Sequence, residues 1–268
     1  MLYNAKNSSV KINNSSMDYI SFGSGKKVLV MLPGLGESLQ SVKGPALPMA
    51  FMYRRFAREY TVYIFSRRDN LPQGYTTADM SADLKCVLDT LGIGKIFLVG
   101  VSMGGMIAQH FAADYQQYVE KLALVVTCAK PNNVAQKAIN HWIKLVKKDD
   151  YKAFMDSNVK LIYSDRYYRK NKLLVPFVSL VTKPKNFDRF FVQADACLSH
   201  NAYDKLQLIT CPVIVIGGEK DMVVGGDASR EIAGAIKGST LKMYSQWGHG
   251  LYEEAKDFID TVADFFRQ

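Results

Sequence analysis

Several features are scarce in this chain of 268 residues, and each absence narrows the choice of function. No apolar run approaches the roughly 18 residues that a membrane span needs, and residues 1–24 show no signal-peptide pattern. The four cysteines are widely spaced and form no CxxC pair, which favours free thiols in a reducing compartment over a disulfide framework. We therefore expect a cytoplasmic protein without a membrane span. The cysteines are Cys86, Cys128, Cys197 and Cys211.

The chain carries an excess of positive charge. The chain has 34 Lys and Arg against 25 Asp and Glu, a formal net charge of +9. Most of the excess lies between Pro131 and Leu206, where eleven Lys and three Arg face seven Asp and no Glu, a net of +7. No nucleic-acid recognition motif accompanies this charge, so we do not expect a nucleic-acid partner.

Buried strands alternate with amphipathic helices along most of the sequence. Two short alternating segments, 9–12 and 18–22, predict a hairpin at a sheet edge. Apolar runs then predict strands buried on both faces. Helices are predicted from Met80 to Leu91, from Met103 to Tyr115, and from Leu251 to Phe265. The pattern indicates an α/β fold with a mostly parallel, doubly wound sheet. The predicted buried strands are 27–32, 60–65, 96–101, 122–126 and 212–216.

The alternation stops after the strand at 122–126, the sixth in the chain. From 131 to 206 no buried strand is predicted, and the segment contains helix-like stretches with eleven aromatic residues. We interpret 131–206 as a helical cap inserted into a core formed by 1–130 and 207–268.

The strongest chemical motif is Gly100-Val-Ser-Met-Gly104, a G-x-S-x-G sequence directly after a predicted strand and before a predicted helix. A turn this tight strains the backbone of Ser102, and the two glycines remove side chains that would collide there. Ser102 then lies at a helix N-terminus, which favours developing negative charge. This context predicts that Ser102 is a nucleophile.

A serine nucleophile needs a base, and the chain has only four histidines. His249 lies in the glycine-flanked loop Trp247-Gly-His-Gly250, which gives its imidazole the freedom to reach the serine, and we predict it as the base. His110 is expected inside the helix after Ser102, and His141 and His200 fall in the insertion, on its surface or lining a cleft.

The acid that orients the base follows the strand at 212–216. Asp221 lies on the same rim of the sheet as Ser102, where catalytic groups of open α/β sheets gather. Glu219 is the main alternative to Asp221 for the role of this acid. Backbone N–H donors for an oxyanion are predicted at Met103, directly after the nucleophile, and at Leu35, in the loop Pro33-Gly-Leu-Gly-Glu-Ser38.

The order Ser102, Asp221, His249 resembles the α/β-hydrolase superfamily, and within it the group of capped esterases, enol-lactonases and C–C-bond hydrolases. The resemblance covers residues 26 to 268 and implies the same roles for these three residues and the same oxyanion donors. One departure is that Pro33-Gly34 replaces the His-Gly that members often have before the oxyanion residue. The hydrogen bond with which that histidine would brace the loop is therefore missing.

Together these features predict a serine hydrolase that cleaves a small to medium ester, lactone or thioester, with neither cofactor nor metal. The alternatives are a C–C hydrolase or acyltransferase with the same triad, and a non-catalytic ligand-binding member of the fold. The cluster Arg166-Tyr-Tyr-Arg-Lys170 in the insertion is either a solvated outer face or an entrance that attracts anionic substrates. The sequence specifies neither the substrate-binding residues nor the oligomeric state.

Overall fold

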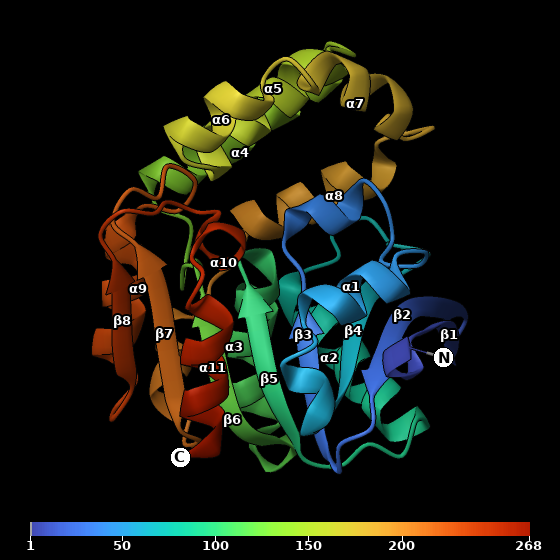
Figure 1. The fold of residues 1–268 in the computed structure, drawn as a ribbon, viewed down its shortest axis with the longest axis vertical. Helices are drawn as coiled ribbons and strands as arrows, with labels where there is room; N and C mark the ends of the chain where they lie inside the picture. The colour runs from blue at the N-terminus through green and yellow to red at the C-terminus, as the bar shows by residue number, and fades with distance from the viewer. Residues whose placement is uncertain (1) are drawn as a thin grey trace.

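The computed structural model describes residues 2–268 and is built around one eight-stranded sheet (Figure 1). The strand order is β1-β2-β4-β3-β5-β6-β7-β8. The pairs β1–β2 and β2–β4 are antiparallel, and every other pair is parallel. This confirms the predicted sheet and its edge hairpin. The strands are β1 (Lys6–Ile12), β2 (Ser15–Gly23), β3 (Lys27–Leu32), β4 (Tyr60–Arg68), β5 (Ile96–Val101), β6 (Val119–Val125), β7 (Val213–Gly218) and β8 (Thr240–Tyr244).

Helices cover both faces of the sheet, because successive residues of each strand point to opposite faces and both faces are apolar. In β5, Leu98 packs in one core cluster, and its neighbours Phe97 and Val99 pack in the other. The first cluster contains the apolar faces of α2, α3 and α9, and the second those of α1 and α11. These helices are α1 (Ala46–Met52), α2 (Thr77–Thr90), α3 (Met103–Asp114), α9 (Gly226–Ala235) and α11 (Phe258–Arg267).

The prediction of one continuous helix from Leu251 to Phe265 is wrong. The chain forms two helices, α10 (Leu251–Glu254) and α11, and the backbone at Ala255 is extended between them. The N–H of Gly250 donates to Ile162 O at 2.6 Å, and Glu254 accepts from the N–H and hydroxyl of Ser164. These bonds fasten α10 to the segment between β6 and β7, whereas α11 packs on the sheet, so one straight helix cannot satisfy both contacts.

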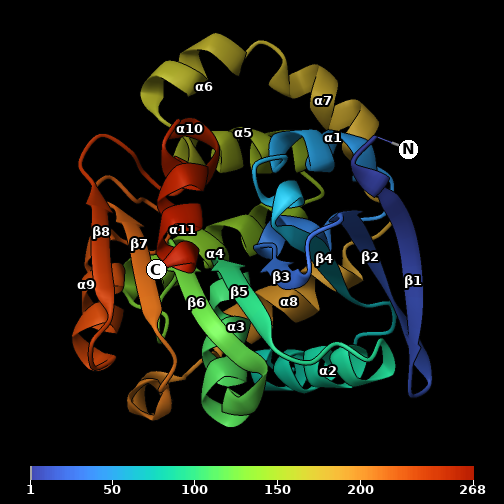
Figure 2. The same ribbon diagram turned by 60° about the horizontal axis from the view of Figure 1, so that its bottom comes forward.

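Five helices lie between β6 and β7, which confirms a helical insertion after the sixth strand. They form a layer beyond the carboxyl ends of the strands (Figure 1), and α6 and α7 are its outermost part (Figure 2). Among residues 2–268, no helix combines the length and the apolar character needed to cross a bilayer. The five are α4 (Asn133–Lys147), α5 (Tyr151–Ile162), α6 (Asp165–Asn171), α7 (Val175–Thr182) and α8 (Asp188–Leu198).

Candidate active site

Ser102 occupies a sharp turn between β5 and α3. Its φ of 54° and ψ of −120° lie in a region that L-residues with a side chain rarely adopt. Hydrogen bonds hold it there: its N–H donates to Val125 O at 2.9 Å, and its carbonyl accepts from Gly105 N and from the Thr127 hydroxyl, both at 2.8 Å. The surrounding backbone thus fixes the strained conformation that presents the hydroxyl at the end of the sheet.

The two glycines that flank the serine are required by close backbone contacts. A Cβ on Gly104 would lie 2.0 Å from Leu32 O in β3, and one on Gly100 would lie 2.5 Å from Gly104 O. Both distances are far below van der Waals contact, so a larger residue at Gly104 would move β3 and one at Gly100 would move the start of α3. The sequence argument for these glycines therefore has a direct steric basis.

His249 and Asp221 complete a chain of hydrogen bonds from Ser102. His249 Nε2 lies 3.0 Å from Ser102 Oγ, and His249 Nδ1 lies 2.8 Å from Asp221 Oδ2. Asp221 Oδ1 accepts from the N–H groups of Val223 and Val224 at 2.8 and 2.9 Å. Burial by itself raises the pKa of Asp221, but His249 and these two N–H groups outweigh it and hold the pKa below its ordinary value. The carboxylate is therefore ionised at neutral pH and faces the imidazole.

The competing candidates lie elsewhere. The Glu219 carboxylate pairs with Arg230 instead of His249. His141 is exposed on α4. His110 and His200 are both buried, with their rings 5.2 Å apart in an edge-to-face contact, and neither lines the cavity at Ser102. Of the four histidines, only His249 contacts the serine.

The two predicted oxyanion donors are both first residues of helices. Met103 begins α3, and Leu35 begins the 3-10 helix η2 (Leu35–Ser38). The first N–H groups of a helix have no partner within it, and neither of these two donates to any atom of residues 2–268. A Cβ on Gly34 would lie 3.7 Å from Ser102 Oγ, which places the Gly34–Leu35 peptide beside the nucleophile.

Hydrogen bonds from two sides hold the peptides that precede Leu35. Arg67 Nη2 donates to Pro33 O at 2.6 Å, and the N–H of Glu37 donates to Gly34 O at 3.2 Å. The Gly34 carbonyl and the Leu35 N–H belong to one planar trans peptide and point in opposite directions. A fixed Glu37 thus fixes the direction of the Leu35 N–H. These contacts brace the loop that begins with Pro33 and Gly34.

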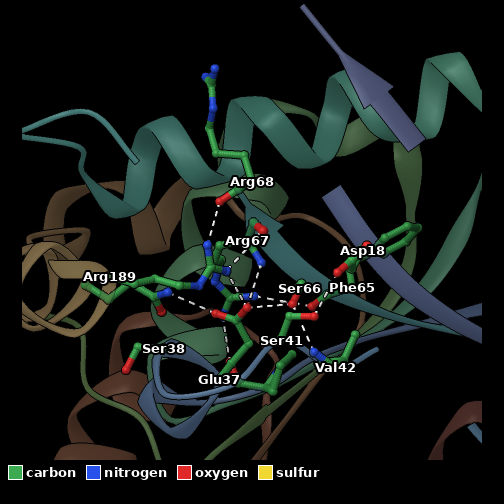
Figure 3. A network of polar contacts seen from close by, with 12 residues as sticks. Asp18, Glu37, Ser38, Ser41, Val42, Phe65, Ser66, Arg67, Arg68 and Arg189 are labelled. Carbon is green, nitrogen blue, oxygen red and sulfur yellow. Dashed lines mark hydrogen bonds and ion pairs between the residues drawn. The ribbon is translucent and has the colours of Figure 1, made fainter. Parts of the chain in front are cut away.

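Glu37 itself is the centre of a buried polar network (Figure 3). Its carboxylate accepts from the Ser66 hydroxyl at 2.5 Å, from Arg67 N at 3.2 Å and from Gln193 Nε2 at 2.9 Å, and it pairs with the Arg189 guanidinium. Burial raises the pKa of Glu37, but the charges of Arg189 and Arg67 and the bonds from Ser66 and Gln193 hold it below its usual range. The carboxylate is thus ionised although it is fully buried.

Arg189 and Gln193 belong to α8, so this network joins the insertion to the core beside Ser102. Arg189 also donates to the carbonyls of Arg68 at 2.7 Å and Arg67 at 3.1 Å, at the end of β4. The sequence pattern does not indicate Glu37, Arg67 or Arg189 as site residues. Their side chains meet only through the tertiary fold, and nothing in their local sequence distinguishes them from solvated charges.

A cavity of about 1010 Å³ opens at Ser102 and His249, between the ends of the strands and the insertion. Five aromatic residues of the insertion line it. The other six aromatic residues of the insertion are not part of its lining. Among residues 2–268, no three His, Cys, Asp or Glu side chains lie close enough to share a metal ion, and the four cysteines are free thiols. The five aromatic residues are Trp142, Phe154, Tyr163, Tyr167 and Phe190.

The chain is similar to known hydrolases. The family model described as alpha/beta hydrolase fold matches residues 27–154. The putative carbamate hydrolase RutD of Caulobacter vibrioides is 22% identical over 250 residues, 90% of each protein. The 2-hydroxy-6-oxo-6-phenylhexa-2,4-dienoate hydrolase of Comamonas testosteroni is 26% identical over 192 residues, 69% of this chain and 67% of that protein.

Among solved structures, the enol-lactonase from Burkholderia xenovorans LB400 superposes with a TM-score of 0.80 and 20% identity, covering 97% of this chain and 100% of that one. With the sheet order, the strained serine turn and the family match, this similarity shows that the chain has the α/β-hydrolase fold. The three relatives are named for different substrates, so the similarity does not select one for this chain.

Proposed function

We propose that this chain is a serine hydrolase that cleaves a carboxylic ester, lactone or thioester through an acyl-enzyme on Ser102. The observation that supports this most directly is the unbroken hydrogen-bond chain from Ser102 through His249 to Asp221 at the wall of a large cavity. A serine hydroxyl with an imidazole nitrogen at 3.0 Å has the base that it needs for attack on a carbonyl carbon.

The proposed reaction uses each group once in each half. His249 Nε2 accepts the proton as Ser102 Oγ bonds to the carbonyl carbon, and the resulting oxyanion accepts hydrogen bonds from the N–H groups of Leu35 and Met103. Asp221 stabilises the imidazolium. The carbonyl re-forms, the leaving group departs with the proton from His249, and a water molecule repeats the sequence on the acyl-enzyme to release the acid.

The lining of the cavity favours a neutral, largely apolar acyl group. No Lys or Arg lines it within the described chain. Of its carboxylates, Glu37 is paired with Arg189, and Glu253 accepts from the Tyr163 hydroxyl at 2.8 Å. An anionic substrate would meet no counter-charge here. We therefore propose a neutral substrate and treat attraction of anionic ones as the weaker possibility.

A hydrolysis panel tests the proposal. It contains chromogenic esters from acetate to long acyl chains, a lactone, a thioester, a carbamate and a carboxylate-bearing ester, each with wild type and Ser102→Ala. We expect sustained turnover of neutral members and a loss of at least about a thousandfold in Ser102→Ala. Labelling by a fluorophosphonate probe should vanish as well, with the melting temperature nearly unchanged. Turnover that survives the substitution would show that another nucleophile acts, and no turnover of any member would reject the activity.

A further inference from the structure

Helix α7, in the outermost part of the insertion, turns apolar side chains toward solvent. Phe177, Val178 and Val181 come three, four and seven residues after Leu174, which is the spacing of one helix face, and all four side chains are exposed. The opposite side of α7 is the one that packs inward, through Val175 and Ser179. An apolar stripe of a surface helix usually faces the core, whereas the stripe of α7 faces away from the protein.

The exposure of this surface is large. Leu173 is 84% exposed, Leu180 is 81% exposed and Phe177 is 66% exposed. Contiguous apolar patches of this kind are rare on soluble proteins unless they contact a partner or a membrane. We call the set the α7 patch: Leu173, Leu174, Phe177, Val178, Leu180 and Val181.

Basic side chains flank the α7 patch on both sides. Six exposed Lys and Arg and a single Asp lie between 165 and 185, a net charge of +5. Only Lys183 makes an ion pair with another residue of the described chain, with Asp149 at 2.7 Å. The other five charges remain free to act on a partner. The six basic residues are Arg166, Arg169, Lys170, Lys172, Lys183 and Lys185.

Charge decides between two kinds of partner. In a symmetric dimer formed through this surface, the patch of one copy would meet the same patch of the other, with +5 against +5. An anionic lipid surface instead attracts the basic residues and accepts the apolar side chains among its acyl chains. We propose that the α7 patch and its basic flanks dock the protein peripherally on anionic phospholipid membranes.

Docking in this orientation has a consequence for the cavity. Tyr167 of α6 lines the cavity, and both α6 and α7 pack on α5, five of whose residues also line it, among them Phe154 and Met155. Of the helices that would rest on the membrane, α6 forms part of the cavity wall and α7 packs on α5, which forms more of it. An apolar substrate dissolved in the lipid would therefore be held close to the cavity.

Vesicle co-sedimentation tests the proposal with Ser102→Ala protein, so that binding is measured independently of hydrolysis. The probes are vesicles of phosphatidylcholine alone and of phosphatidylcholine with about a third phosphatidylserine. We expect at least about tenfold stronger binding to the anionic vesicles, since each Lys or Arg near such a surface strengthens binding about fivefold. High salt should reduce the difference.

Three variants assign the effect. Phe177→Ser with Leu180→Ser should weaken binding to anionic vesicles at least tenfold, as should Lys170→Gln with Lys172→Gln and Lys185→Gln. The control Leu208→Ser with Leu241→Ser removes exposed apolar side chains elsewhere and should bind as wild type. Equal binding by all variants, or no binding by wild type, would overturn the proposal. A wild-type dimer in light scattering that Phe177→Ser with Leu180→Ser dissociates would assign the patch to self-association instead.

Discussion

Replacing Asp221 with Asn should nearly abolish catalysis without removing a single heavy atom from the site. In the native structure Asp221 Oδ1 accepts two backbone N–H groups, from Val223 and Val224, and Oδ2 accepts from His249 Nδ1. An asparagine has only one acceptor oxygen, and the two N–H donors will take it. Its NH₂ group must then point at His249 Nδ1.

That arrangement reverses the imidazole. To accept from the amide, Nδ1 must give up its proton, and the ring then has its proton on Nε2, 3.0 Å from Ser102 Oγ. Nε2 can no longer accept the proton of the serine. The wrong tautomer at such a triad costs about ten-thousandfold in kcat, or about 5.5 kcal/mol of transition-state stabilisation. KM should change little because Asp221 does not touch the substrate.

The assay is steady-state hydrolysis of the best ester in the panel by wild type, Asp221→Asn and the control Glu219→Gln. Glu219 precedes Asp221 by two residues and pairs with Arg230 at the surface, so its variant should retain nearly full kcat. A loss of less than about a hundredfold in Asp221→Asn would refute the tautomer argument. Exchanged phenotypes would make Glu219 the acid.

Two further predictions follow from buried polar groups. Glu37→Gln should lower kcat about ten- to a hundredfold with little change in KM, because Glu37 holds the Leu35 N–H in its direction. Misaligning this oxyanion donor should cost less than removing a donor outright, which costs about a hundred- to a thousandfold. The control Glu254→Gln, which weakens another tie between core and insertion, should keep kcat. Burial and the neighbouring His110 lower the pKa of His200 to about 3, below its value of about 6.5 in the unfolded chain. Because the unfolded state binds this proton first, wild type should lose about 2 kcal/mol of stability relative to His200→Gln between pH 7.5 and 5, measured by urea unfolding.

The elements that the sequence predicts correctly are those with local causes. Strands buried on both faces leave continuous apolar runs, and the serine turn requires glycines within two residues of Ser102. The sequence also brings His249 and Asp221 forward as candidates, because few His and acidic residues lie at the end of a predicted strand or in a glycine-flanked loop. Here the chemistry of single segments determines the geometry, and the hydrogen bonds between Ser102, His249 and Asp221 match it.

What the sequence cannot predict depends on contacts between distant segments. Glu37 and Arg189 are 152 residues apart, and nothing near either of them indicates that they form a buried pair. The break at Ala255 likewise depends on bonds from the loop after His249 to the insertion. Residues in helix-periodic patterns continue a helix unless a tertiary contact interrupts it, and such contacts are absent from the local pattern.

The net charge of the insertion shows why position matters more than amount. A count of Lys and Arg between 131 and 206 led to the hypothesis of an entrance for anionic substrates. In the structure, Arg166, Arg169 and Lys170 are exposed and do not line the cavity, and the insertion contributes aromatic rings there. A long-range field from outer charges is screened within about 10 Å at 0.1 M salt, so it acts mainly on whatever lies against the outer face. The inner face of the insertion offers aromatic and apolar contacts to a substrate, and its outer face is the one whose charge can act on a partner.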